Sequence, residues 1–286
     1  MASEHSNSSN SQRWRSLVGF GLTGVATLIS LGALFSILGY LIYNGIGAIN
    51  WNFIVKEPAA VGEAGGGIAP SLLGTAILVA ISMIFGVPLG VGVGIYLSEI
   101  AGETHFARIA RVAINTFIGV PSIIVGIFVY FILVKPTNTF SAVAGGLALG
   151  IIMIPIMART TEDVLRLVPK NIREAGLALG APRWHVMLHI VLPAARAGVI
   201  TGGILAVARV AGETAPLILT ALGNEYYPTS LFKPIDEITL RILKYARGPY
   251  DVWHQQAYGA ALVLVFGVAA GSLLLRLSTR TKGAAR

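Results

Sequence analysis

The sequence predicts an all-α integral membrane protein with six transmembrane helices. Of its 286 residues, 55% are hydrophobic and only 12% are charged, and the mean hydropathy is +0.74. A soluble domain of this size would carry about 25% charged residues. The apolar runs are continuous and do not alternate with polar residues, which favours helices over a membrane barrel.

The apolar runs divide the chain into a short tail, a first helix with its loop, and a main transmembrane domain. We expect a disordered, Ser/Asn-rich tail over 1–16, a first helix and outer loop over 17–63, a transmembrane domain over 64–280, and a tail over 281–286. The first span carries no charge and is too long for a signal-peptide core. The six predicted spans are 17–43, 70–97, 112–134, 140–158, 197–222 and 257–275.

A polar stretch over 166–193 separates the fourth and fifth spans and keeps helical periodicity. Gly180 is placed to end a first short helix, Pro182 suits the first turn of a second, and Pro193 is expected to end it. The pattern predicts a helix-turn-helix that lies outside the membrane and presents an apolar stripe. The alternative is an amphipathic helix lying on the membrane surface.

The distribution of basic residues predicts the orientation of the chain. Most of its 21 lysines and arginines fall in the two tails, in the loop after the second span, and in 166–193. By the positive-inside rule, both termini and 166–193 are then cytoplasmic. The net charge of +8 is explained by this orientation and does not require a nucleic-acid partner.

Two ionisable residues, Arg209 and Glu213, lie within the fifth predicted span. An arginine at the centre of a membrane helix costs roughly 2.5–3.5 kcal/mol on insertion scales, so such residues pair, face the bundle interior or line a water-filled path. Their i, i+4 spacing places them on one helical face. The alternative to a role in transport is a structural ion pair that holds this span to a neighbour.

Proline and glycine residues predict breaks in two spans. Pro216 cannot donate to the carbonyl of Gly212, so the fifth span should bend or open beside Arg209 and Glu213. Thr214 lies in the same segment and adds a hydroxyl group. Pro121 is expected to break the third span, either beside a pathway or merely to pack against a neighbouring kink. Irregular backbone at membrane depth survives only inside protein or along a cavity.

The polar stretch resembles the "EAA" loop of ABC-importer permeases. In that family the loop docks as a coupling helix into a groove on a cytoplasmic ATPase, and the second alanine of the family pattern is Gly176 here. The residues that carry the likeness are Glu174, Ala175, Gly180, Ile190, Leu192 and Pro193.

A second resemblance covers most of the chain from Gly65 onward. The stretch ARVAGETAPLILTA, with GGGIAPSLLGT, VPLGVGVGIYLSE, GVPSIIVGIF and IPIMARTTEDVLRLVP, is similar to the A subunit of Pst-type phosphate permeases. The resemblance implies a type I ABC-importer permease in a bacterial inner membrane. It also implies a sister permease subunit, two ATP-binding subunits and an extracytoplasmic phosphate-binding protein. In that family the residues matching Arg209 and Glu213 are thought to matter for phosphate passage.

Several function classes lack their sequence signals. The chain has no phosphate-binding loop of the G-x-x-x-x-G-K-[ST] type, so ATP and Mg²⁺ are expected on partner subunits and this chain is expected to hold no cofactor and not to be an enzyme. It has no cysteine, and His185 and His189 have helical spacing but no nearby third ligand, so no metal site is expected. The remaining alternatives are a sulfate or molybdate permease and an ATP-independent channel.

Overall fold

The computed structural model describes residues 4–61, 63 and 65–281, and their side chains between residues 16 and 277. This part of the chain is helical, without a β-strand. Its α-helices are α1 Glu4–Gly45, α2 Trp51–Val55, α3 Ala69–Ile95, α4 His105–Ile118, α5 Ser122–Val129, α6 Lys135–Thr137, α7 Ala142–Arg166, α8 Lys170–Ala178, α9 Arg183–Val186, α10 Leu192–Val210, α11 Ala215–Ile218, α12 Ile238–Arg247 and α13 Asp251–Thr281. Single π-helical turns occur at Tyr96–Ile100, Tyr130–Val134 and Met187–Val191.

The prediction of an all-α membrane protein with six spans is confirmed. In the described residues, five helices are long and apolar enough to cross a membrane, and a sixth span is made of α4 and α5 together. These two helices meet at an angle of 99°, across residues 119–121. The third span is therefore broken at Pro121, whose fixed φ and missing N–H suit it to stand before a new helix and not inside one.

The fifth span lies further toward the N-terminus than predicted, and Pro193 does not end the helix before it. One helical run extends over Arg183–Val210 and passes through Pro193. The π turn over Met187–Val191 directly precedes this proline, and Pro193 stands in the first turn of α10, where no N–H is needed. The run then ends at Val210, well short of residue 222.

The prediction of a disordered tail over residues 1–16 also differs from the structure. Helix α1 begins at Glu4, so that most of this segment continues the first span. Helix propagation adds one hydrogen bond for each further residue, so a long apolar helix extends readily into a polar flank. The first three residues of this tail, and all but the first residue of the 281–286 tail, lie outside the described residues.

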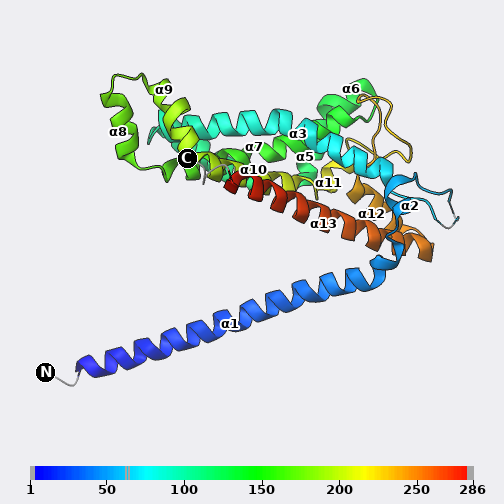
Figure 1. Ribbon diagram of the computed structural model, residues 1–286, viewed down its shortest axis with the longest axis horizontal. Coiled ribbons are helices and arrows are strands. Elements are labelled where there is room, and N and C mark those ends of the chain that lie inside the picture. The colour runs from blue at the N-terminus through cyan, green and yellow to red at the C-terminus, as the bar shows by residue number, and fades with distance from the viewer. Residues whose placement is uncertain (1–3, 62, 64, 282–286) are drawn as a thin grey trace.

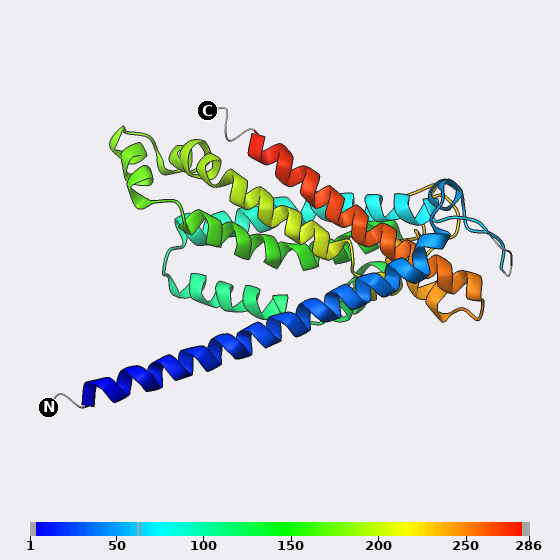
Figure 2. The same cartoon turned by 60° about the horizontal axis from the view of Figure 1, so that its bottom comes forward.

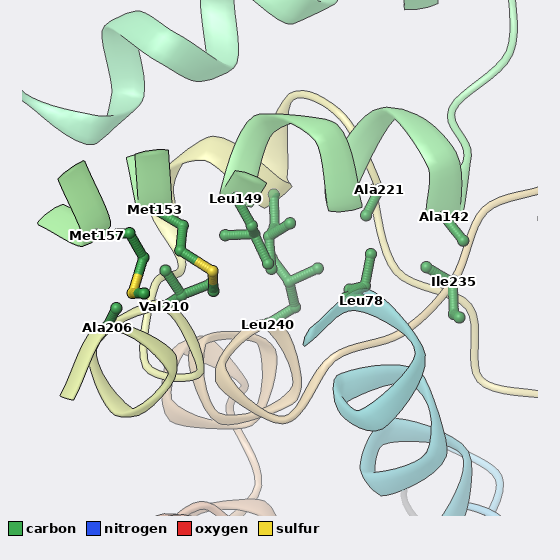
Figure 3. Packing of buried hydrophobic residues seen from close by; sticks show 11 residues of the cluster. Leu78, Ala142, Leu149, Met153, Met157, Ala206, Val210, Ala221, Ile235 and Leu240 are labelled. Atoms are coloured by element: carbon green, nitrogen blue, oxygen red, sulfur yellow. The ribbon is translucent and has the colours of Figure 1, made fainter. Parts of the chain in front are cut away.

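Helices α3 and α7 form the central pair of the bundle. Three glycines of α3 spaced four residues apart lie on this contact, where Gly86, Gly90 and Gly94 meet the side chains or backbone around Met153, Met157 and Thr161. A Cβ atom added at Gly90 would stand 2.4 Å from the Cβ of Met157, so only glycine permits this approach. Figure 3 shows Met153 and Met157 of α7 directed toward Ala206 and Val210 of α10.

The bundle has two distinct ends (Figure 1). Helices α8 and α9 form one end, which we call the α8 end, and α2, α6 and α12 lie at the other, which we call the α12 end. Helix α1 begins, and α13 ends, toward the α8 end (Figures 1 and 2). Helix α1 diverges from the bundle and meets it near Gly45, which packs on the backbone of Tyr258 in α13.

Candidate functional site

Two interrupted spans meet in the interior of the bundle. The break between α4 and α5 lies at residues 119–121, and the break between α10 and α11 lies at residues 211–214. Helices α5 and α11 contact each other, and a Cβ added at Gly126 of α5 would stand 2.6 Å from the Cα of Pro216. Gly119, Pro121 and Gly212 are exposed in the single chain, so irregular backbone at this depth requires a further protein or a water-filled path beside it.

Arg209 lines a small cavity at this meeting point. The other lining residues come from the α4–α5 break and from the middle of α7: Phe117, Ile118, Val120, Ser122, Val125, Ile152 and Ile156. Since Ile152 and Ile156 lie near the centre of the 25-residue helix α7, Arg209 lies at about the depth of the middle of the bundle. The cavity measures about 10 Å³ in the volume open to the centre of a water molecule, which is room for about one water.

Arg209 and Glu213 form a loose ion pair. The Nη2 atom of Arg209 lies 3.7 Å from Oε1 of Glu213, which is longer than a charge-assisted hydrogen bond. The Arg209 side chain is 53% exposed, whereas that of Glu213 is 16% exposed. The guanidinium group therefore keeps donors available on its open side, in the geometry that matches an oxyanion.

The backbone between α10 and α11 leaves the helix one turn before Pro216. Ala211 ends α10, and the N–H groups of Gly212 and Glu213 donate to carbonyls three residues earlier, as in a tightened last turn. Thr214 precedes α11, is half-buried, and its side chain does not cap that helix. Pro216 is buried in the first turn of α11, where its missing N–H costs nothing.

The polar stretch over 166–193, which we call the coupling stretch, has one set of residues that faces outward and one that faces the bundle. Glu174, Ala175 and Gly180 are exposed, and Gly180 has a φ of 83°, the left-handed conformation expected of a helix stop. Ile190 and Leu192 instead pack against a buried cluster that joins the end of α7 to the start of α10. Pro193 is exposed at the start of α10.

Gly176 explains how the two short helices of the stretch fit together. It is buried on the inward face of α8, where an added Cβ would lie 2.8 Å from Cδ1 of Ile190 and 3.0 Å from a methyl group of Val186. An alanine at this position would crowd the second helix, and the outward face keeps Leu177, Leu179 and Trp184 exposed.

Sequence reasoning missed a buried polar cluster at the α12 end. The predicted spans assign no helix between residues 222 and 257, yet α12 lies there, and its Arg241 is only 1% exposed and binds Asp236 at 2.7 Å. Asp236 also accepts a hydrogen bond from Ser71 of α3. An acidic residue before an amphipathic run is a helix-start signal, and that signal over Glu237 and the following residues would have predicted α12.

Glu237 has an unusual environment within this cluster. It caps α12 by accepting from the N–H groups of Thr239 and Leu240, and it faces the hydroxyl of Thr75 in α3. Burial raises the pKa of this carboxyl to about 7, against the lowering effect of its hydrogen bonds with Thr239. The hydroxyl of Thr239 also lies 3.4 Å from the carbonyl oxygen of Glu213, so α12 reaches the break beside Arg209.

Charged residues near the end of α7 form ion pairs that are largely buried at the α8 end. Glu162 of α7 is 2% exposed and binds Arg111 of α4 at 2.7 Å and Arg166 at 2.8 Å. Arg173 of α8 binds Glu99 in the π turn that extends α3. The pair Glu162–Arg166 has local i, i+4 spacing on α7, whereas the cross-helix pairs Glu162–Arg111 and Arg173–Glu99 do not follow from spacing, because those partners lie far apart in the chain.

The two histidines of the coupling stretch stack on each other, with ring centroids 4.1 Å apart. Within the residues that the structure describes, no group of three or more His, Cys, Asp or Glu side chains is arranged to hold a metal ion. The stacked pair is therefore an exposed surface feature next to Trp184.

Comparison with known proteins identifies the family. Residues 86–281 match the family described as "Binding-protein-dependent transport system inner membrane component". The chain belongs to this family. The permease is thus a multi-pass membrane protein, and the matched region contains both interrupted spans, Arg209 and the coupling stretch.

Named relatives and a solved structure agree with this assignment. The permease is 36% identical to the phosphate transport system permease protein PstA of Yersinia pestis, over 93% of this chain and 91% of that protein. It is 40% identical to the PstA protein of Haemophilus influenzae, over 86% and 87% of the two chains. A permease chain of the MetNI methionine ABC transporter has the same fold, with a TM-score of 0.58 and 20% identity over 74% of this chain and 94% of that one.

Proposed function

We propose that this permease is a transmembrane subunit of an ATP-driven phosphate importer. The observation that carries the proposal is the placement of Arg209 at mid-depth, in a cavity where two interrupted spans meet. A cation with free donors in such a place suits the passage of an anion. The names of the relatives add the substrate, because both PstA proteins are described as phosphate transport permeases.

The cavity beside Arg209 is too small to hold the transported ion in this conformation. Room for about one water is too little for a phosphate ion, so passage requires the α4–α5 break to move away from α7 and α10. Arg209 then offers paired donors to the ion, and Glu213 and Thr214 complete the polar wall. Between transport events Glu213 holds Arg209, and weak binding at this point lets the ion leave.

The open side of Arg209 supports a sister permease as partner. A guanidinium group that is 53% exposed at mid-depth cannot face lipid without a large cost, so protein or a water-filled path must cover it. We infer a heterodimer with a related permease, with the path running between the two. Membrane lipid would surround the remaining apolar surface.

The exposed face of the coupling stretch supports the other partners. Glu174, Ala175 and the neighbouring exposed leucines would dock on one of two cytoplasmic ATP-binding subunits, which hold ATP and Mg²⁺ and carry out the hydrolysis. The α8 end and both termini are then cytoplasmic. The α12 end would receive phosphate from an extracytoplasmic binding protein.

Phosphate uptake by the assembled transporter tests this proposal. We expect ATP-dependent uptake of radiolabelled phosphate at low concentration that requires this chain and is insensitive to excess sulfate or molybdate. Arg209→Ala should reduce uptake at least about tenfold, which corresponds to the loss of roughly 1.4 kcal/mol of transition-state stabilisation. The Arg209→Lys variant keeps the charge but loses the planar guanidinium group. Its phosphate uptake should lie between that of the native chain and that of Arg209→Ala.

Four results would each overturn a different part of the proposal. Uptake inhibited by sulfate or molybdate would indicate another oxyanion, and uptake unaffected by removing the chain would exclude phosphate. Undiminished uptake in the Arg209→Ala variant, with the complex intact, would move the path away from Arg209. Uptake without ATP-binding subunits would favour an ATP-independent channel.

A further inference from the structure

Arg173 occupies a position in α8 that the coupling motif leaves unassigned. It directly precedes the exposed residue Glu174, but its own side chain is turned back toward the bundle and is 19% exposed. Its Nε and Nη2 atoms bind the two carboxylate oxygens of Glu99, at 3.0 Å and 2.7 Å. The pair is thus a bidentate fork between residues 74 positions apart in the chain.

The same guanidinium group also caps the end of α7. Its Nη2 donates to the carbonyl oxygen of Leu165 at 2.7 Å, and its Nη1 donates to that of Val168. The last carbonyls of a helix have no partner within the helix and carry a partial negative charge, so a cation there is favourable. Four hydrogen bonds from one side chain therefore fix α8 to two other elements.

Glu99 belongs to the π turn over Tyr96–Ile100, which continues α3 beyond Ile95. Its side chain is 15% exposed and also accepts from the hydroxyl of Ser98 at 2.9 Å. Arg173 thus joins α8 to α3 through Glu99, to the last turn of α7 through Leu165, and to the turn after α7 through Val168. We call Arg173 and Glu99 the α8 clamp.

The helices joined by the α8 clamp lead to the cavity beside Arg209. Helices α3 and α7 are locked together along their length by the close approach of Gly86, Gly90 and Gly94 to α7. Helix α7 then supplies Ile152 and Ile156 to the cavity wall. Movement of α8 can therefore reach the cavity through one continuous packed body.

The apolar contacts beneath α8 cannot fix its direction by themselves. Ile172 packs with Val186 and Val191 in the cluster at this end, and contacts of this kind are non-directional. A bidentate pair fixes both a distance and an angle, because its two hydrogen bonds are parallel. The clamp therefore supplies the directional part of the connection.

We propose that Arg173 and Glu99 are positioning residues that make α8 move with α3 and α7 as one body, and so set how much transport each hydrolysed ATP produces. The inference rests on the proposed function and deepens it. Without the clamp, α8 still docks on the ATP-binding subunit. Part of the movement of α8 is then not transmitted to α3 and α7, because α8 slides over the apolar cluster beneath it.

The first experiment measures the number of ATP molecules hydrolysed per phosphate imported by the complete transporter in proteoliposomes. Arg173→Ala should raise this ratio several-fold while the ATP-binding subunits still co-purify. Glu99→Gln should raise it less, because the bonds to the α7 carbonyls remain. Combining Glu99→Gln with Arg173→Ala should add little to the single Arg173 variant, as expected for residues that act as a unit.

A matched ion pair provides the control. Arg159 and Asp163 form a 2.9 Å pair of the same type, but both lie on α7 and both are exposed, so they join no two elements. Arg159→Ala should leave the ratio unchanged. An equal increase in this control would mean that any loss of charge at this end uncouples the transporter, which would overturn the assignment.

The second experiment requires neither phosphate nor ATP. Because the chain has no cysteine, single cysteines can be placed at Ala178 of α8 and at Gly92 of α3, both exposed, and spin-labelled. The distance distribution between the labels should be narrow with the native clamp and broader in Arg173→Ala. Proteoliposomes that import no phosphate with the native chain would contradict the proposed function only. An unchanged distribution together with an unchanged ATP-to-phosphate ratio would contradict the clamp.

Discussion

The contact between helices α3 and α7 and the contact between α5 and α11 both depend on glycine, but they differ in extent. Between α3 and α7, glycines at every fourth position from Gly86 to Gly94 let two unbroken helices approach closely over more than two turns. Between α5 and α11, Gly126 meets Pro216 beside two helix breaks, so that two short segments touch over a small area. The first contact extends over several turns, whereas the second is local.

The difference separates the rigid part of the molecule from the part able to open. A long contact between continuous helices is costly to deform, because every turn loses packing at once. A short contact between helix ends can separate at a smaller cost, and the break at residues 119–121 provides a place for the chain to bend. We therefore expect α3 and α7 to move together and the walls around Arg209 to move apart.

The largest expected effect concerns the long contact. In Gly90→Leu, the new side chain would overlap Met157, whose Cβ lies 2.4 Å from the position of an added Cβ. Forcing such atoms into a packed contact costs at least about 3 kcal/mol. The unfolding temperature in detergent should therefore fall sharply, or the protein should fail to accumulate. Gly92→Leu is the matched control, since nothing lies within 4 Å of its Cβ position. Equal stability of the two variants would contradict the rigid-pair interpretation.

A second prediction concerns the α12 end, where Glu237 fastens α12 to α3. Its pKa is raised to about 7 from 4.5, so the folded protein binds a proton more tightly than the unfolded chain. Stability should therefore fall as the pH rises from about 4.5 to 7, by up to about 3 kcal/mol in total. Glu237→Gln should flatten the dependence of the unfolding temperature on pH. If the unfolding temperature of Glu237→Gln still falls as the pH rises, a group other than Glu237 causes the pH dependence.

The smallest effect is expected at the local contact. Gly126→Ala places a Cβ 2.6 Å from the backbone of Pro216, which must shift, at a cost of roughly 1–3 kcal/mol. We expect a modest fall in unfolding temperature and a larger change in the rate of phosphate uptake, because the shift displaces a wall of the path. Gly203→Ala in α10 is the control, since the nearest neighbour of its added Cβ would be 3.8 Å away. Unaltered uptake in Gly126→Ala would show that this contact does not influence passage.

Local chemistry made much of the architecture predictable from the sequence. The spans follow from hydropathy, and the breaks at Pro121 and Pro216 follow from the missing proline N–H. The i, i+4 spacing of Arg209 and Glu213 is likewise local, and the structure contains that pair. Prediction failed at Pro193, because a π turn altered the hydrogen-bond register before the proline.

Residues close together in the chain were enough to predict the membrane class, the number of spans and the helix breaks, although the fifth helical run begins before Pro193 and not after it. The packing of the helices decides which breaks meet and leaves the Arg209 side chain exposed on one side. It also brings Arg173 to Glu99 and forms the buried pair of Arg241 and Asp236. Those outcomes depend on helices packing against each other at ångström distances. Hydropathy and spacing along a single chain do not specify such contacts, because many pairs of apolar faces are equally compatible with them.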